Sequence, residues 1–248
     1  MVKETEPILE IRDLVISFGE TRVIDGISLS LYPGESLVLL GKSGAGKSVI
    51  MKCIVGLMEP DSGRIRVFGK ELLDLREKEL NNLRTRIGYL FQEGALYDSM
   101  SILENLLFPA RRNERLRKLP ERELRDLAIE NLDLLGLKDA AGKMPAELSG
   151  GMKKRAGLAR TLMLSPELII YDEPTTGLDP FTSESISHLI RKIQEQYDTS
   201  SVIITHDIKC AEIAGDRIMV LNDGKIVGEG SVVELKKHPN EEVRLFFK

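Results

Sequence analysis

The chain has few cysteines, no long apolar run and no start that resembles a secretory leader. Its two cysteines, Cys53 and Cys210, lie in no paired motif, so we expect buried thiols rather than a disulfide framework. His206 stands four residues before Cys210, but two ligands do not make a tetrahedral metal site. No apolar run approaches the ~20 residues that span a bilayer. We therefore expect a cytoplasmic protein that reaches a membrane only through a partner.

An excess of one sign of charge is also absent. The 35 Lys and Arg residues nearly balance the 39 Asp and Glu residues, and the formal net charge is -4. This balance gives no reason to expect nucleic acid as a partner. A basic stretch from Arg111 to Arg125 is a candidate for binding lipid headgroups or an acidic partner, but a solvated helical face is the simpler interpretation.

The distribution of apolar residues predicts one α/β domain with a helical insertion. Segments rich in Ile, Val and Leu, separated by Gly or Pro, predict strands at residues 8–18, 23–32, 36–40 and 64–68. Helical spacing follows over residues 101–164, where Ser101 and Glu104 form a capping box. Short apolar runs at 168–172 and 201–205 predict buried parallel strands, and residues 217–229 predict a hairpin. We expect a core sheet at residues 1–92 and 166–248, with an N-terminal antiparallel β region, and an inserted helical subdomain at 93–165.

Residues 41–48 match the phosphate-loop pattern G-x-x-x-x-G-K-[ST]. They follow a predicted strand and precede a run compatible with a helix, a context that argues against a glycine-rich turn without a ligand. Glycines there let backbone N–H groups curl around phosphates, while Lys47 reaches the outer phosphates and Ser48 ligates Mg²⁺. The residues predicted to bind ATP with Mg²⁺ are Gly41, Lys42, Ser43, Gly44, Ala45, Gly46, Lys47 and Ser48.

Two acidic residues, Asp172 and Glu173, stand at the end of the predicted parallel strand at 168–172. Ligands of open α/β sheets collect at the carboxyl ends of the strands. Asp172 is therefore a candidate to hold Mg²⁺ through water, and Glu173 to orient or deprotonate the water that attacks the γ-phosphate. Alone, such a pair is often only a solvated strand end, but the phosphate loop favours the catalytic interpretation.

A second anion site is predicted at Ser149, Gly150 and Gly151. Apolar residues at helical spacing follow them, so Ser149 is a candidate N-cap and the glycines expose the first amides of a helix. A capped helix end needs no ligand. The order of the motifs favours a ligand, because this site comes just before the strand that ends in Asp172.

With these motifs the chain resembles the ATP-binding cassette (ABC) ATPases over essentially its whole length. Leu148 to Gly151 resemble the family signature, Gln92 the Q-loop, Gly177 to Asp179 the D-loop and His206 the switch histidine. The resemblance implies that two cassettes face head to tail, and that each ATP lies between the phosphate loop of one cassette and the signature of the other. A second cassette subunit is thus an expected partner, most simply as a homodimer.

The resemblance also implies roles for single residues. Gln92 would ligate Mg²⁺ or contact the attacking water, and His206 would hydrogen-bond the γ-phosphate, so both join Glu173 as expected catalytic residues. Asp179 is an expected contact of the nucleotide site. Phe18 occupies the place where the family stacks an aromatic ring on adenine, although an apolar core residue is the alternative.

A closer resemblance concerns the expected substrate. Met152 after the signature glycines, and residues 91–100, are similar to the ATPases of Mla and Mce phospholipid transporters. This similarity implies an MlaE-type permease, an MCE-domain lipid-binding protein and a position on the cytoplasmic face of the inner membrane. The apolar residues expected either to anchor the permease or to pack the helical subdomain are Leu96, Tyr97, Met100 and Ile102.

Two alternatives to phospholipid transport stay open from the sequence. One is a cassette for another substrate, and the other is a soluble ABC ATPase of DNA repair or translation, although long coiled-coil insertions and zinc modules are absent. A nucleotide-binding regulator without turnover is disfavoured because Glu173 is present. The apolar tail residues Val243, Phe246 and Phe247 are expected to pack either on a second subunit or on the chain's own core.

Overall fold

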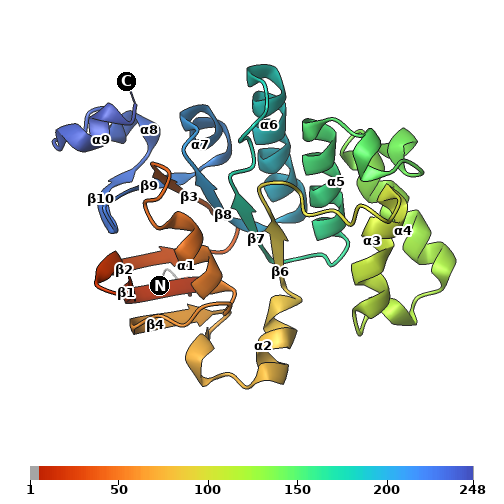
Figure 1. Cartoon of the computed structure of the whole chain (residues 1–248), viewed down its shortest axis with the longest axis horizontal. Helices are drawn as coiled ribbons and strands as arrows, with labels where there is room; N and C mark the ends of the chain where they lie inside the picture. Colours follow the sequence, from red (N-terminus) through yellow and green to blue (C-terminus); the bar gives the residue numbers. More distant parts are fainter. Residues whose placement is uncertain (1–5, 248) are drawn as a thin grey trace, which may run out of the picture.

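The computed structural model describes residues 6–247, which form two β-sheets flanked by helices (Figure 1). The smaller sheet has the strand order β2-β1-β4-β5 and is antiparallel. Its strands are β1 (Leu9–Phe18), β2 (Thr21–Leu31), β4 (Ser62–Val67) and β5 (Lys70–Glu71). This sheet is the predicted N-terminal antiparallel β region.

The larger sheet has the strand order β10-β9-β3-β8-β7-β6. All neighbouring pairs are parallel except β9 and β10, which form the predicted hairpin. Its strands are β3 (Ser36–Gly41), β6 (Ile87–Leu90), β7 (Leu168–Asp172), β8 (Ser200–Thr205), β9 (Arg217–Asn222) and β10 (Lys225–Gly230). Because β3, β8 and β7 are adjacent and parallel, the residues that follow them meet at one edge of the sheet.

The helices separate into those of the core and those of the inserted segment. Core helices are α1 (Lys47–Ile54), α2 (Glu77–Arg84), α6 (Pro180–Tyr197), α7 (Ile208–Ala214), α8 (Val232–Leu235) and α9 (Glu241–Leu245). The inserted helices are α3 (Ile102–Arg112), α4 (Glu121–Leu134) and α5 (Gly150–Leu162). Short 3-10 turns lie at Leu72–Asp74, Leu116–Lys118, Lys138–Ala140 and Pro145–Glu147.

Two apolar cores lie on the two faces of the larger sheet. Leu37 and Leu39 of β3 belong to a core shared with the smaller sheet and α1, whereas Val38 and Leu40 belong to a core shared with α3 to α7. This division follows from the two-residue period of a strand, and a strand covered on both faces is apolar throughout. Helix α1 therefore lies between the two sheets, with α5, α6 and α7 on the other face of the larger sheet (Figure 1).

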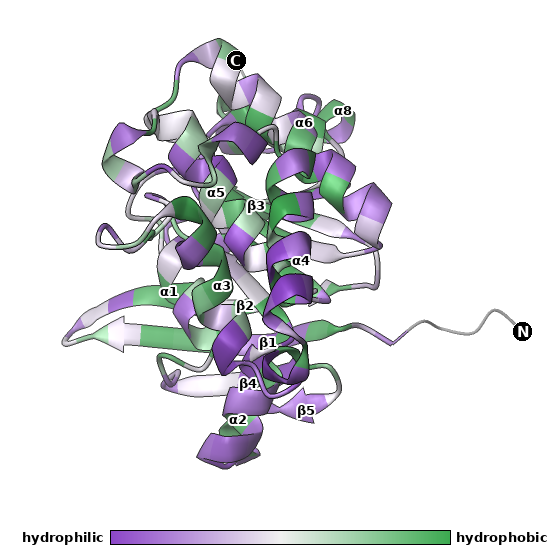
Figure 2. Cartoon of the chain, turned by 90° about the vertical axis from the view of Figure 1, so that its right-hand side faces the viewer, coloured by the Kyte–Doolittle hydropathy of each residue, from purple (hydrophilic) through white to green (hydrophobic). Residues whose placement is uncertain are grey.

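Hydropathy follows the same division. Hydrophobic residues are concentrated on the strands and on the inward faces of the helices, while α4 and α2 carry hydrophilic residues outward (Figure 2). The predicted capping box of Ser101 with Glu104 begins α3, and a second one, of Ser231 with Glu234, begins α8. Among the described residues, no helix combines the length and the apolar character that crossing a membrane requires.

Two expectations about apolar segments are decided by burial. The tail packs on the chain's own core, because Val243 is fully buried and Phe246 and Phe247 contact the same apolar cluster as α7. Ile102 is also fully buried, so it packs the helical segment and is not a surface anchor. Tyr97, in contrast, is 45% exposed and stacks on Phe108 with ring centroids 4.7 Å apart.

Candidate functional site

The phosphate loop joins the end of β3 to the start of α1. A Cβ on Gly46 would lie 2.5 Å from the Ile24 side chain, and the residue has φ +94, so only glycine fits there. A Cβ on Gly41 would lie 2.7 Å from the Leu221 carbonyl oxygen. Helix α1 has no side-chain N-cap and no acidic residue in its first turn, which leaves its first amides available for an anion.

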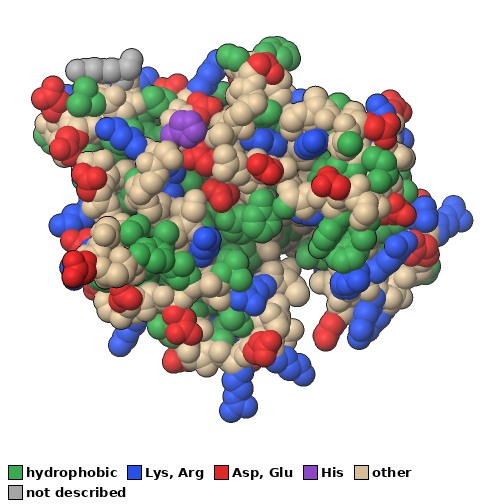
Figure 3. All heavy atoms as spheres, viewed as in Figure 1, with side chains coloured by type: hydrophobic (Ala, Val, Ile, Leu, Met, Phe, Trp, Pro, Cys, Tyr) green, Lys and Arg blue, Asp and Glu red, His purple; other side chains and the backbone are tan. Residues whose placement is uncertain are grey.

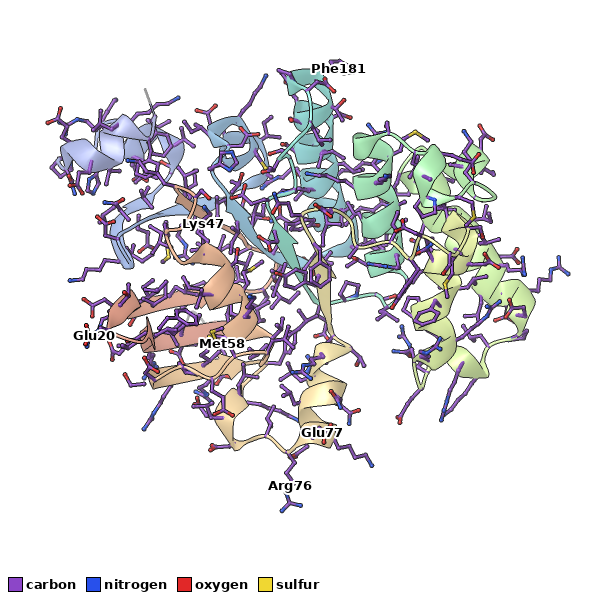
Figure 4. All side chains as sticks on the ribbon, in the orientation of Figure 1. Glu20, Lys47, Met58, Arg76, Glu77 and Phe181 are labelled. Atoms are coloured by element: carbon purple, nitrogen blue, oxygen red, sulfur yellow. The ribbon has the colours of Figure 1, made fainter. Side chains whose placement is uncertain are left out.

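Lys47 is a buried cation in the first turn of α1 (Figure 4). Its ammonium donates to the carbonyl oxygens of Gly41 at 2.6 Å and Lys42 at 2.9 Å. It also lies 3.4 Å from the carboxylate of Glu173. The loop thus holds a positive charge directly beside the carboxylate that the sequence predicts to activate water.

Glu173 has left-handed backbone geometry, with φ +49, immediately after β7. Its N–H donates to the Ile204 carbonyl oxygen at 2.9 Å. Its carboxylate lies 2.8 Å from Nδ1 of His206 and accepts a hydrogen bond from the Thr176 hydroxyl at 3.0 Å. The structure therefore brings together Lys47, Glu173 and His206, three residues that the sequence places far apart.

Asp172, the last residue of β7, accepts a hydrogen bond from the Tyr89 hydroxyl at 3.1 Å. Burial raises the pKa of Asp172, and the neighbouring Glu173 adds to the increase, whereas the Tyr89 hydrogen bond and Lys47 oppose it. Burial thus removes part of the water that would solvate the ionised Asp172 carboxylate, and a bound cation would stabilise its negative charge.

The sequence did not predict a role for Asp207, Thr175 or Tyr89 in this region. Asp207, the N-cap of α7, accepts a hydrogen bond from Thr175 at 2.9 Å and so ties the residue after His206 to the segment after Glu173. Tyr89 contacts Asp172 from the neighbouring strand. Asp207 follows His206 in the sequence, Thr175 lies close after Glu173, and Tyr89 lies in the strand before Gln92. Proximity to these predicted residues was the only signal, because Asp, Thr and Tyr are all common at strand ends or helix caps.

Ser149 caps α5 as predicted, because its hydroxyl accepts from the Met152 N–H at 3.3 Å. Asp179 likewise caps α6 by accepting from the Thr182 N–H at 3.0 Å, and these Thr182 hydrogen bonds lower the pKa of Asp179. Ser149 and Asp179 are both exposed. The residues predicted to form the signature and the D-loop thus present polar groups at the surface.

Gln92 is separate from the hydrogen-bonded residues at the strand ends. It is exposed and lines a cleft of about 530 Å³ together with Gly150 and Gly177. In the space-filling view an indentation lies between the α/β core and the helical segment (Figure 3). The structure records no hydrogen bond from Gln92 to the other described residues of the site, so its catalytic role stays a prediction.

Phe18 lies at the end of β1 and is 52% exposed. The alternative of an apolar core residue is therefore wrong, and the ring is free to stack on a ligand. The basic stretch supports the simpler interpretation made from the sequence, because Arg111 and Arg125 both pair with Glu121 on an exposed face.

Comparison with known proteins bears on this arrangement. A family profile described as "ABC transporter" matches residues 24–176. The chain is 43% identical over 213 residues to the "Probable ribonucleotide transport ATP-binding protein mkl" of Mycobacterium leprae (strain TN), covering 86% of this chain and 60% of that protein. It is 38% identical over 237 residues to the "Methionine import ATP-binding protein MetN" of Brucella abortus (strain 2308), covering 96% and 63%.

The chain spans about three fifths of the length of these curated relatives. Among solved structures, it is similar to the "Dimeric structure of a post-hydrolysis state of the ATP-binding cassette MJ0796 bound to ADP and Pi". The TM-score is 0.79 at 31% identity, covering 90% of this chain and 98% of that one. The likeness confirms the predicted fold class.

Proposed function

The chain belongs to the ABC transporter family, and from this membership we propose that it is the ATP-hydrolysing subunit of a membrane transporter. The observation that carries the proposal is the contact of Glu173 with both Lys47 and His206, at 3.4 Å and 2.8 Å. A cation from the phosphate loop, a carboxylate and an imidazole thus meet at one sheet edge, an arrangement suited to hydrolysis of a nucleoside triphosphate.

Each residue has a separate task in this reaction. Lys47 and the free amides of α1 stabilise the negative charge of the outer phosphates. Glu173 orients the attacking water and accepts its proton, and the Thr176 hydroxyl fixes one oxygen of that carboxylate. His206 contacts that same carboxylate oxygen, while Lys47 lies beside the other one, and the exposed His206 ring reaches the γ-phosphate.

The residues available for a metal ion suit Mg²⁺ that arrives with the nucleotide. Ser48, Asp172 and Gln92 offer a hydroxyl, a carboxylate and an amide oxygen, which are hard ligands. Among the described residues no group of three or more His, Cys, Asp or Glu side chains is placed to hold a metal. A cation held partly by phosphates needs no such group, and it would neutralise charge that develops during hydrolysis.

A second cassette completes the proposed site. Ser149 to Gly151 contact neither Lys47 nor Glu173 through any hydrogen bond recorded for the described residues, yet they offer a capped helix start at the surface. A relative of 31% identity is described as dimeric and bound to ADP and Pi. We place the signature of one subunit, with its Asp179, opposite the phosphate loop of the other. Phe18 is proposed to stack on adenine.

For the transported substrate we propose phospholipid, moved through an MlaE-type permease at the cytoplasmic face of the inner membrane with an MCE-domain protein. Met152 after the signature glycines and the sequence of residues 91–100 support this choice. The relatives carry other names, ribonucleotide transport for one and methionine import for another. A cassette for such a substrate is therefore the competing outcome of the test.

Two experiments test the two levels of the proposal. Phosphate release from Mg-ATP by the purified chain tests hydrolysis, with Lys47→Ala prepared in parallel to measure contaminating ATPases. Equal rates for the two proteins would contradict the ATPase proposal. Co-purification from native membranes, followed by identification of the bound proteins, tests the substrate class. Recovery of a permease for amino acids or nucleotides, or of ribosomes or nucleic acid, would overturn the lipid proposal.

A further inference from the structure

Lys154 is a buried cation whose hydrogen bonds end on backbone oxygens. It lies in α5, is 5% exposed, and donates from Nζ to the carbonyl oxygens of Thr176 at 2.6 Å and Glu173 at 3.3 Å. Both acceptors belong to the segment that follows β7. The preceding residue of α5, Lys153, makes no side-chain hydrogen bond or ion pair with the described residues.

Keeping an ammonium group at this position is unfavourable for the fold by itself. Burial lowers the pKa of Lys154, and the carboxylate of Glu173 opposes that decrease without forming an ion pair within 4 Å of it. A buried charge without an ion-pair partner costs free energy, and the hydrogen bonds to the two carbonyl oxygens offset only part of that cost. A role beyond stability therefore accounts better for the ammonium group.

The acceptors identify that role. Glu173 has φ +49, a region that is unfavourable for a residue with a Cβ, so surrounding contacts must hold it there. Its N–H is held by Ile204 and its carbonyl oxygen by Lys154. The direction of the carboxylate depends on this backbone geometry.

Helix α5 also connects this segment to the rest of the site. Its first residues are the signature glycines, and Lys154 follows Gly151 within one turn. Two turns farther on, Arg160 donates to the carbonyl oxygens of Gly94 and Ala95, just after Gln92. A movement of α5 would therefore be transmitted to the segment of Glu173.

We propose that Lys154 is a positioning residue that holds the backbone of Glu173 and Thr176, and thereby makes the geometry of the Glu173 carboxylate depend on the position of α5. The inference rests on the proposed ATPase function. In the dimer, a nucleotide bound at the signature of one subunit would then act, through Lys154, on the water-activating carboxylate of that subunit's own phosphate-loop site.

The experiment compares Lys154→Met with Lys153→Met, two substitutions of the same kind at neighbouring positions. Measurements on the full chain are kcat and KM for Mg-ATP, equilibrium binding of a fluorescent ATP analogue, and amide hydrogen exchange of peptides covering residues 173–178. Lys154→Met is expected to lower kcat at least tenfold, to keep nucleotide affinity within twofold, and to accelerate exchange in that segment. Lys153→Met is expected to match the unmodified chain.

A third variant separates positioning from folding. Lys154→Arg retains charged N–H donors on a side chain long enough to reach both carbonyl oxygens, so it is expected to keep kcat within about threefold of the unmodified chain. A Lys154→Met chain with full kcat, or a Lys154→Arg chain as inactive as Lys154→Met, would overturn the proposal. If the unmodified chain hydrolyses no ATP, the proposed function fails, while hydrogen exchange still decides whether Lys154 holds the segment.

Discussion

Glu173 and His206 are hydrogen-bonded at 2.8 Å across 33 residues of sequence. The contact forms because each residue directly follows one of two adjacent parallel strands, β7 and β8. The Glu173 side chain is 13% exposed and that of His206 is 56% exposed. The carboxylate is therefore held inside the site by a ring that still reaches solvent, where the terminal phosphate of a nucleotide would enter.

Glu173→Gln tests the role of that carboxylate. The amide keeps the size of the side chain but accepts a proton poorly, so we expect ATP to bind and its hydrolysis to fall by about 10²–10⁴-fold. The variant is also expected to accumulate as an ATP-bound dimer in size-exclusion chromatography. Glu167→Gln is the control, since Glu167 forms a half-exposed pair with Arg86 away from the site. Wild-type turnover by the Glu173 variant would remove this residue from catalysis.

Lys47→Ala is expected to fail at an earlier step, nucleotide binding. Lys47 is the buried lysine of the phosphate loop, whereas Lys42 is exposed, with its ammonium group 6.0 Å from the Phe246 ring centre. Charge-assisted hydrogen bonds are each worth about 1.5–3 kcal/mol. The expected loss of ATP affinity is thus roughly ten- to hundredfold, measured by titration with a fluorescent ATP analogue. Lys78→Ala, an exposed substitution in α2, should leave affinity unchanged. Unaltered ATP affinity in Lys47→Ala would contradict the phosphate-loop interpretation.

Much of this site was predictable, because its residues follow short apolar strands in sequence. Lys47, Asp172 and His206 each lie within one or a few residues of a strand end, and parallel strands place those ends together. Capping residues such as Ser149 were predictable for a similar reason, since their hydrogen bonds are local. Such capping signals can be recognised from neighbouring residues alone, without knowledge of the tertiary structure.

The parts that were not predicted depend on contacts between distant residues. Helices α2, α6 and α7 were not expected from the sequence, and α7 has only seven residues. The left-handed geometry of Glu173 is unusual for this residue type and is supported by a hydrogen bond from Lys154 of α5. A lysine among other basic residues after the signature gave no sign that it would be buried.

Asp172→Asn tests separately how the Asp172 carboxylate affects the stability of the fold and how it affects hydrolysis. Burial raises the pKa of Asp172 in the folded chain, so the folded state binds this proton more tightly than the unfolded state. The contribution of protonated Asp172 to the free energy of unfolding is complete below the unfolded-state pKa, and it is lost as the pH rises through the folded-state pKa. At neutral pH the ionised carboxylate therefore destabilises the nucleotide-free fold.

The Asn variant is thus expected to unfold at an equal or higher denaturant concentration than the unmodified chain at pH 7, with the difference disappearing at low pH. Its Mg-dependent hydrolysis is expected to be lost. Urea unfolding at several pH values, followed by circular dichroism, measures the first effect, and phosphate release measures the second. A less stable variant at pH 7 would show that the hydrogen bond from Tyr89 outweighs desolvation.

The two thiols are expected to be unreactive in the folded chain. Cys53 and Cys210 are 1% and 0% exposed, and burial raises the pKa of the first to about 11 and of the second to about 12. At pH 8 neither forms an appreciable amount of thiolate, which is the reactive species. Ellman's reagent should therefore label almost no thiol under native conditions and two per chain in 6 M guanidinium. Rapid labelling of one native thiol would show that its surroundings open on the timescale of the assay.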